Sequence, residues 1–137
     1  MKKILLILSF ILVTNAVLFA QQNKDEDPIG KAFYSPELVM QNQQAINLAE
    51  TQRNTIQKEL EAAQSEFMTM QWNLQKEMEK FKLLIAKEKP VETEVSEQLD
   101  RMLAIENKIK KRQIALLTRI KNRLTHEQQE KLMRLKQ

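Results

Sequence analysis

The chain has 137 residues, about one domain, with 22 basic and 18 acidic residues, a net charge of +4, one Gly, three Pro and no Cys. This composition is poor in sheet and turn formers and favours long helices. It excludes disulfides, thiolate metal sites and cysteine nucleophiles, and a single Gly excludes a glycine-rich phosphate loop.

The first twenty residues have the pattern of a secretory signal peptide. Lys2 and Lys3 precede an almost purely apolar run (4–13), and the segment ends at Ala20. Residues 1–20 are therefore expected to be a Sec-type signal peptide. The alternative is a retained anchor, which the short apolar core disfavours. No later apolar run is long enough to span a bilayer, so we expect no stable membrane insertion after cleavage.

The next segment, residues 21–34, contains an acidic cluster at 25–27 and the single Gly, and is expected to be a flexible N-terminal lead-in. A helical domain is expected over 35–137. Its start is marked by Ser35, a capping hydroxyl, and by Pro36 in the first helical position. A short helix is predicted from there to about Ile46.

Two long apolar stripes follow, each with spacings of three or four residues. The first predicts one helix from about Asn47 to Glu88, which Pro90 ends. The second predicts a helix capped by Thr93 that ends at about Arg123. The first stripe comprises Ile56, Leu60, Ala63, Phe67, Met70, Leu74, Met78, Phe81 and Ile85. The second comprises Val95, Leu99, Met102, Ile105, Ile109, Leu116 and Ile120. The predicted fold is all-α, a long antiparallel helical hairpin with short flanking helices.

Charged residues beside each stripe give a separate indication of the antiparallel arrangement. On the first helix the acidic line is Glu59, Glu66, Glu77 and Glu88; on the second the basic line is Arg101, Lys108, Arg112, Arg119 and Arg123. Folding about Pro90 brings these flanks together. The predicted neighbours are Glu59 with Arg119 and Arg123, Glu66 with Arg112 and Arg119, and Glu77 with Arg101 and Lys108. Exposed pairs of this kind add little stability, so their register indicates orientation.

Several large apolar residues lie partly off both stripes: Trp72, Leu83, Leu103, Ile114 and Leu117. A two-helix hairpin is a thin core for a chain of this size. We therefore expect a homodimer, with these residues packing the short helices, a second copy or another partner.

The sequence contains no convincing catalytic constellation, so no enzyme activity and no cofactor are expected. The single histidine, His126, precedes Glu130 by four residues, which places both on one helical face. Two side chains fall short of the three or four that zinc takes from protein, so both are weak metal candidates and no metal site is predicted. A net charge of at most +4 gives no indication of nucleic-acid binding.

The segment 124–128 combines Leu124, Thr125 and Gln128 in an L-T-x-x-Q pattern. Thr125 and Gln128 form a capping box at the start of a last short helix. An earlier copy keeps Leu48 and Gln52 but has Ala49 in place of Thr, and Asn47 with Glu50 offers an alternative cap. Two such motifs around a helical hairpin resemble the Spy/CpxP family of periplasmic proteins, in particular its heavy-metal-resistance and metal-sensor branch.

The resemblance implies a periplasmic, dimeric, Spy/CpxP-like fold and an ATP-independent holdase-like chaperone or envelope-stress accessory protein. Its partners would be unfolded or partly folded envelope proteins, or a sensor protein. Apolar and basic residues of the hairpin supply the expected client or partner surface: Trp72, Leu103, Arg112 and Arg119. Other members of the family imply an alternative, a resistance or sensor-regulatory protein that responds to zinc, nickel or cobalt. A structural coiled-coil adaptor is a third hypothesis.

Overall fold

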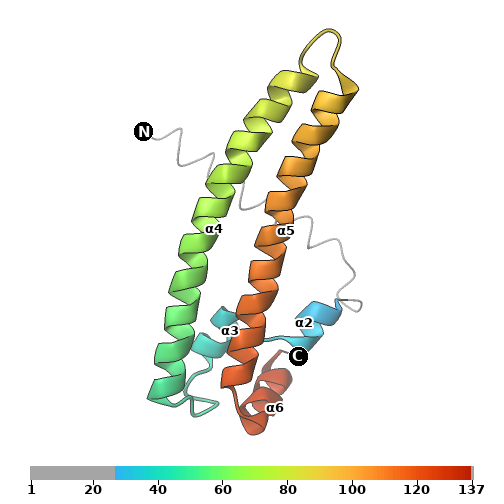
Figure 1. The fold of residues 1–137 in the computed structure, drawn as a ribbon. Coiled ribbons are helices and arrows are strands. Elements are labelled where there is room, and N and C mark those ends of the chain that lie inside the picture. Colours follow the sequence, from blue (N-terminus) through green and yellow to red (C-terminus); the bar gives the residue numbers. More distant parts are fainter. Residues whose placement is uncertain (1–26, 137) are drawn as a thin grey trace, which may run out of the picture. The chain divides into compact units, whose positions relative to one another are not determined.

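The computed structural model describes residues 27–136, so the predicted signal peptide (1–20) lies outside the described residues. The described residues form helices and connecting turns, without a strand (Figure 1). This confirms the predicted all-α class.

The chain divides into two compact units between Phe33 and Tyr34. The described part of the first unit holds the helix α2 (Pro28–Ala32). Asp27 caps it, because the Asp27 carboxylate accepts a hydrogen bond from the Ile29 N–H at 3.1 Å. The expected lead-in thus contains one short helix that its sequence pattern did not predict.

The second unit begins with helix α3 (Pro36–Gln41), which starts at the predicted residue. Ser35 Oγ accepts a hydrogen bond from the Leu38 N–H at 3.2 Å. The predicted end at Ile46 is wrong, since α3 stops at Gln41 and turns follow as far as Asn47. The Leu38 carbonyl accepts hydrogen bonds from both the backbone N–H and the side-chain amide of Asn42, at 3.2 and 2.8 Å, where the helix ends.

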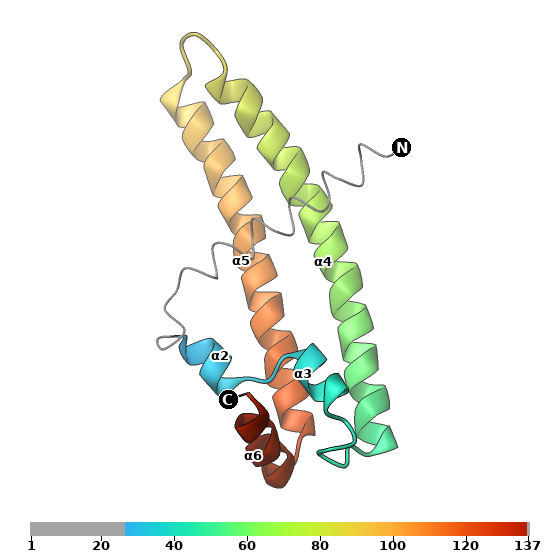
Figure 2. The same ribbon diagram turned by 180° about the vertical axis from the view of Figure 1, so that it is seen from behind.

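The two long helices, α4 (Glu50–Ile85) and α5 (Glu92–Arg123), pack side by side and antiparallel (Figures 1 and 2). This confirms the predicted hairpin. Helix α5 ends at Arg123 as expected, whereas the other helix ends differ: α4 spans Glu50–Ile85 within the predicted 47–88. The N-cap of α5 is Val91 rather than Thr93, because the chain is already extended at Val91 after Pro90 and turns helical at once.

Helix α6 (His126–Leu135) follows α5 after a single turn and lies with α3 at the open end of the hairpin (Figure 2). The core occupies this end. Its buried apolar residues are Tyr34, Val39, Ile46, Ile56, Ala63, Leu116, Ile120, Leu124 and Leu132. The members from α4 and α5 all come from the half of each helix nearest the open end. Beyond them toward the turn, Met102 is the only buried apolar residue of the described hairpin.

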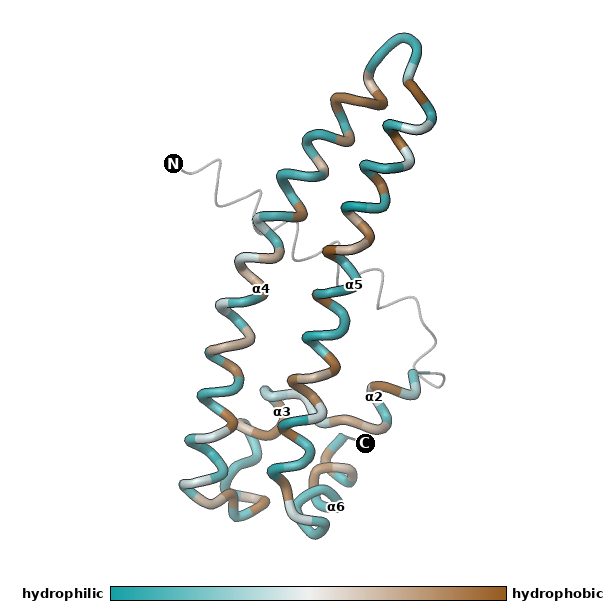
Figure 3. The backbone as a smooth tube through the Cα atoms, in the orientation of Figure 1, coloured by the Kyte–Doolittle hydropathy of each residue, from teal (hydrophilic) through white to brown (hydrophobic). Residues whose placement is uncertain are grey.

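The seam positions of α4 alternate strictly between spacings of three and four residues, and those of α5 do so from Val95 to Leu116. The average spacing of 3.5 residues is typical of supercoiled helices. This corrects three predicted stripe positions near the turn. Met78, Ile85 and Leu99 are 37%, 48% and 41% exposed. Their neighbours occupy the seam instead: Glu77 and Leu84 are half-buried and Gln98 is buried. Figure 3 shows hydrophilic residues recurring between the hydrophobic ones along both helices.

Candidate functional site

The first Gln motif begins helix α4. Ala49 is the N-cap, and Gln52 Oε1 accepts a hydrogen bond from the Ala49 N–H at 2.9 Å. Alanine has no side-chain acceptor, so only half of a capping box forms. The alternative cap predicted from Asn47 and Glu50 is wrong. Gln52 places the cap at Ala49, and Asn47 lies outside the helix, in the preceding turn, with a left-handed φ of 51°.

The second Gln motif, at the start of α6, forms the complete capping box predicted from the sequence. Thr125 Oγ1 accepts from the Gln128 N–H at 3.2 Å, and Gln128 Oε1 accepts from the Thr125 N–H at 2.9 Å. Leu124, immediately before the cap, is buried in the core. Leu48, its counterpart in the first motif, is half-buried against the same core.

The two motifs meet through their glutamines. Gln52 Nε2 donates to Gln128 Oε1 at 2.8 Å, and Gln128 Nε2 donates to Gln52 Oε1 at 3.0 Å. Gln52 Nε2 also donates to the Arg123 carbonyl at 2.7 Å, while Gln128 Nε2 reaches the carbonyls of Ile46 and Asn47 at 3.3 and 3.4 Å. Both amides therefore use all their donors and acceptors within the chain. The motif residues join the starts of α4 and α6 and leave no capacity for a ligand.

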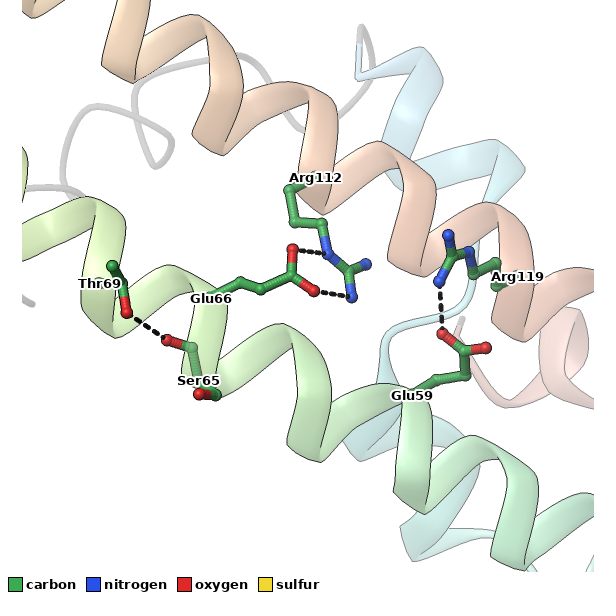
Figure 4. A network of polar contacts seen from close by, with 6 residues as sticks. All are labelled: Glu59, Ser65, Glu66, Thr69, Arg112 and Arg119. Carbon is green, nitrogen blue, oxygen red and sulfur yellow. Dashed lines mark hydrogen bonds and ion pairs between the residues drawn. The ribbon is translucent and has the colours of Figure 1, made fainter.

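The basic residues Arg112 and Arg119 form ion pairs between the long helices (Figure 4). Arg112 donates from Nε and Nη2 to the two carboxylate oxygens of Glu66 at 2.7 and 3.1 Å. Arg119 Nη1 donates to Glu59 at 2.9 Å. Both contacts were among the neighbours predicted from the register. The side chain of Arg112 is 12% exposed, and its Nη1 is buried without a hydrogen-bond partner. Both ion pairs lie on one flank of the hairpin. Arg112 is therefore poorly placed to meet a client, whereas the Arg119 side chain is 55% exposed.

The third predicted set of neighbours is found only in part. The positive charge of Arg101 acts on the Glu77 carboxylate, but neither Arg101 nor Lys108 forms an ion pair with Glu77 among the described residues. Gln98 Nε2 instead donates to the Glu77 carboxylate at 2.7 Å and to its carbonyl at 2.8 Å. Lys80 Nζ also donates to Glu77 Oε1, at 2.7 Å. Gln98 is 3% exposed and Glu77 is half-buried, so this pair forms a polar layer across the seam. A glutamine beside Leu99 gives no sequence signal for such a role.

These contacts shift the pKa values of the groups on this flank. Hydrogen bonding from Arg112 holds the pKa of Glu66 below its ordinary value. Hydrogen bonds from Lys80, and then from Gln98, lower the pKa of Glu77 in the same way. The Glu59 carboxylate raises the pKa of Arg119. All three shifts favour the charged forms and therefore the closed flank.

The apolar members of the expected client surface, Trp72 and Leu103, are 56% and 44% exposed. They do not share a face. At 100° per residue, Trp72 lies on the side of α4 turned away from the seam, whereas Leu103 lies on one flank of α5. Met68, 62% exposed, is one turn before Trp72, and Leu83, 72% exposed, is three turns after it. Trp72, Met68 and Leu83 together are termed the outer face of α4.

The weak metal candidates His126 and Glu130 do come together, with His126 Nε2 3.3 Å from Glu130 Oε1. The His126 side chain is 90% exposed. Within residues 27–136, no group of three or more metal-ligating side chains gathers at one point. The pair offers two donors on the first turn of α6, with open positions for solvent or a further ligand.

No helix in the described part of the chain is both long and apolar enough to cross a membrane. No family model, curated protein or solved structure matches the chain.

Proposed function

We propose that the protein is a periplasmic, ATP-independent holdase-like chaperone or envelope-stress accessory protein that binds non-native envelope proteins. The observation that carries this proposal is the exposure of Met68, Trp72 and Leu83 on the outer face of α4. Large apolar side chains that remain in water on a rigid helix favour contact with other apolar chains.

The spacing of these residues suits weak and sequence-tolerant binding. Met68 and Trp72 form a two-residue patch, and Leu83 stands apart from them by 11 residues, or about 16 Å along the helix. Methionine and tryptophan adapt to many apolar partners. The neighbouring Lys76 is exposed and adds a positive charge one turn after Trp72. An extended client would meet separate apolar points along one helix rather than a single deep pocket.

The L-T-x-x-Q motif at 124–128 and its earlier copy with Ala49 support the same proposal through the resemblance to Spy/CpxP proteins, and the pattern of residues 1–20 supports export. The motif residues themselves have a structural part in it. They join the start of α4 to the start of α6 at the open end of the hairpin, and in this way they would keep the long helices in place while the outer face of α4 binds a client.

Suppression of aggregation tests the proposal. A chemically denatured client is diluted into buffer with the purified mature protein, and light scattering is recorded. Near-stoichiometric suppression is expected, and a Met68→Ser/Trp72→Ser variant should lose most of it. Gln64→Ser, at an exposed position on the same helix, is the matched control. Absence of suppression by the wild type, or full suppression by the double variant, would contradict the proposal.

The single tryptophan of the chain supplies a direct readout of the same contact. With a tryptophan-free client, binding at the outer face should shift Trp72 emission to shorter wavelength, because an exposed indole becomes covered. Suppressed aggregation with unchanged Trp72 emission would place the client elsewhere on the hairpin.

A metal-responsive function is the second candidate, favoured by the approach of His126 to Glu130 at 3.3 Å. The exposed pair would take zinc, nickel or cobalt if a further copy or partner completed the ligands. Calorimetry with zinc, on the wild type and on His126→Ala, tests it. Tight binding that His126→Ala abolishes would favour this function, whereas binding that survives the substitution would exclude this pair as the site.

A further inference from the structure

The methionines of residues 27–136 differ widely in their exposure to solvent. Met68, on the outer face of α4, is 62% exposed, and Met133 and Met78 follow at 38% and 37%. The other three are half-buried or buried: Met40, Met70 and Met102. Peroxides oxidise a methionine sulfur that solvent reaches, and the product is methionine sulfoxide. Met68 is therefore the methionine of the described chain that a peroxide should oxidise first.

The side chain of Met68 lies away from the packed side of α4. At 100° per residue, its position is about 120° from the seam line between Ala63 and Phe67. A sulfoxide oxygen would stay in water there, so it would not disturb the contact between α4 and α5. Met102 is the opposite case, because it is 8% exposed in the seam, where a polar oxygen would disrupt apolar packing. Exposure and position thus direct oxidation to a residue whose change the fold tolerates.

Met68 and Trp72 are the large apolar side chains on the solvent side of α4 between Ala62 and Gln75. They are four residues apart, so their side chains are neighbours on the helix surface. The charged residue of this stretch is Glu66, whose carboxylate is bound by Arg112 on another side of the helix. Contact at this patch therefore depends on apolar area, and a polar sulfoxide in place of the thioether removes a large part of it.

The oxidation transfers an oxygen atom to the sulfur. A lone pair of the Met68 sulfur attacks an oxygen of hydrogen peroxide, so that the S–O bond forms and the O–O bond breaks. The departing hydroxide takes the proton from the transferred oxygen and leaves as water. The sulfur is oxidised by the two electrons that reduce the peroxide. The reversal needs a methionine sulfoxide reductase, which releases the oxygen as water while a pair of thiols is oxidised to a disulfide.

We propose that Met68 is a reversible oxidation site, and that a peroxide switches off binding at the outer face of α4 while the hairpin stays folded. The site follows from the exposure and position of Met68, whereas its consequence for binding rests on the proposed function. Trp72 and Leu83 remain apolar after the oxidation, but they lie three turns apart. The oxidised face therefore presents single apolar residues instead of a patch.

Oxidation of the purified mature protein with graded hydrogen peroxide tests the site. Peptide mapping by mass spectrometry should show the sulfoxide of Met68 before that of any other methionine. At that dose the melting temperature should be unchanged, because Met68 lies outside the seam. Oxidation of Met78 or Met133 ahead of Met68, or unfolding when Met68 is oxidised, would overturn the proposal.

Hydrophobic-interaction chromatography of the same samples reports the apolar surface without any client. Oxidation should weaken the retention of the wild type, whereas Met68→Leu should keep the retention of its own unoxidised sample. Met133→Leu, which replaces an exposed methionine of α6, is the matched control and should lose retention as the wild type does. Equal losses in the two variants would overturn the proposal.

Suppression of client aggregation tests the consequence, with the peroxide removed before the client is added. Each protein is compared with its own unoxidised sample. For the wild type and Met133→Leu, the concentration that gives half-suppression should rise about threefold or more after oxidation, because apolar contact area is lost. For Met68→Leu that concentration should not change, and treatment with methionine sulfoxide reductases should restore the oxidised wild type.

The outcomes separate this proposal from the proposed function. An equal rise in Met68→Leu, or no rise in the oxidised wild type, would overturn the switch and leave the holdase function standing. An unoxidised wild type that suppresses no aggregation would contradict the proposed function and with it the switch. Peptide mapping and chromatography would then still decide whether Met68 is the oxidation site.

Discussion

Gln52 and Gln128, 76 residues apart, exchange two hydrogen bonds between their side-chain amides at 2.8 and 3.0 Å. Each also accepts a hydrogen bond from the backbone N–H of the residue three positions before it. One pair of amides therefore caps two helices and ties them together. The repeated Gln motif has a physical meaning here that is independent of any ligand.

Substitution of Gln128 should destabilise the fold. Gln128→Leu removes donors to the Ile46 and Asn47 carbonyls, and the half-buried Gln52 side chain loses the two hydrogen bonds that it shares with Gln128. Buried polar groups without partners cost about 1–3 kcal/mol, so we expect a loss of about 2 kcal/mol in the free energy of unfolding. Urea denaturation followed by circular dichroism measures it. Gln64→Leu, at an exposed position of α4, should change the value by less than about 0.5 kcal/mol. An equal loss in both variants would refute the amide-pair account.

Restoring the missing hydroxyl of the first motif should stabilise α4. Ala49 has φ −66° and ψ 151°, close to the φ −71° and ψ 163° of the capping residue Thr125. In Ala49→Thr the new Oγ1 can accept from the Gln52 N–H and complete the capping box, a gain of about 1 kcal/mol. The rise in the urea midpoint is the measurement. Ala49→Val, which has the same shape without the hydroxyl, should give no such gain.

The sequence patterns predicted the hairpin and two of its ion pairs because those features repeat at regular spacings. Apolar periodicity located the long helices, and the register of acidic and basic residues placed Glu66 beside Arg112 and Glu59 beside Arg119. A helix end, by contrast, depends on single hydrogen bonds such as that between Gln52 and Ala49, which a periodic pattern does not contain.

The polar layer escaped prediction for a different reason. Leu99 and Met78 are apolar and lie one position from the seam, so they fit the pattern of an apolar helical stripe. Gln98 and Glu77, which occupy the seam, are polar and do not fit that pattern. The underwinding of the paired helices to 3.5 residues per turn decides which of the two neighbours enters the seam. The amide pair was also hidden, since a hairpin brings the two motifs to one end but does not orient their side chains.

Stability should fall in acid because Glu66 and Glu77 have pKa values below the ordinary 4.5. The folded state then binds fewer protons than the unfolded state near that pH, so stability increases with pH there. Their contribution is complete above about pH 4.5 and is lost as the pH falls through the lowered pKa values of the folded protein. Urea midpoints measured from about pH 3 to pH 7 should show this slope, and Glu66→Gln/Glu77→Gln should flatten it. A double variant with the wild-type slope would assign the acid sensitivity to other groups.

The polar layer of Glu77 and Gln98 can be replaced to test whether it stabilises the hairpin or specifies the register in which α4 and α5 pair. Gln98→Leu alone should lower the melting temperature, because the Glu77 carboxylate loses its 2.7 Å donor inside the seam. Glu77→Leu/Gln98→Leu should raise it above the wild type, since an apolar layer replaces a desolvated polar one. Gln75→Leu, at an exposed position of α4, tests whether added hydrophobicity alone has this effect.

Amide hydrogen exchange then tests the register in which α4 and α5 pair. Loss of the polar layer should leave the protection of backbone amides high. It should make that protection less uniform between Phe81 and Val95, where the seam is half-buried. If the double variant melts below the wild type, the layer stabilises the hairpin itself rather than specifying its register.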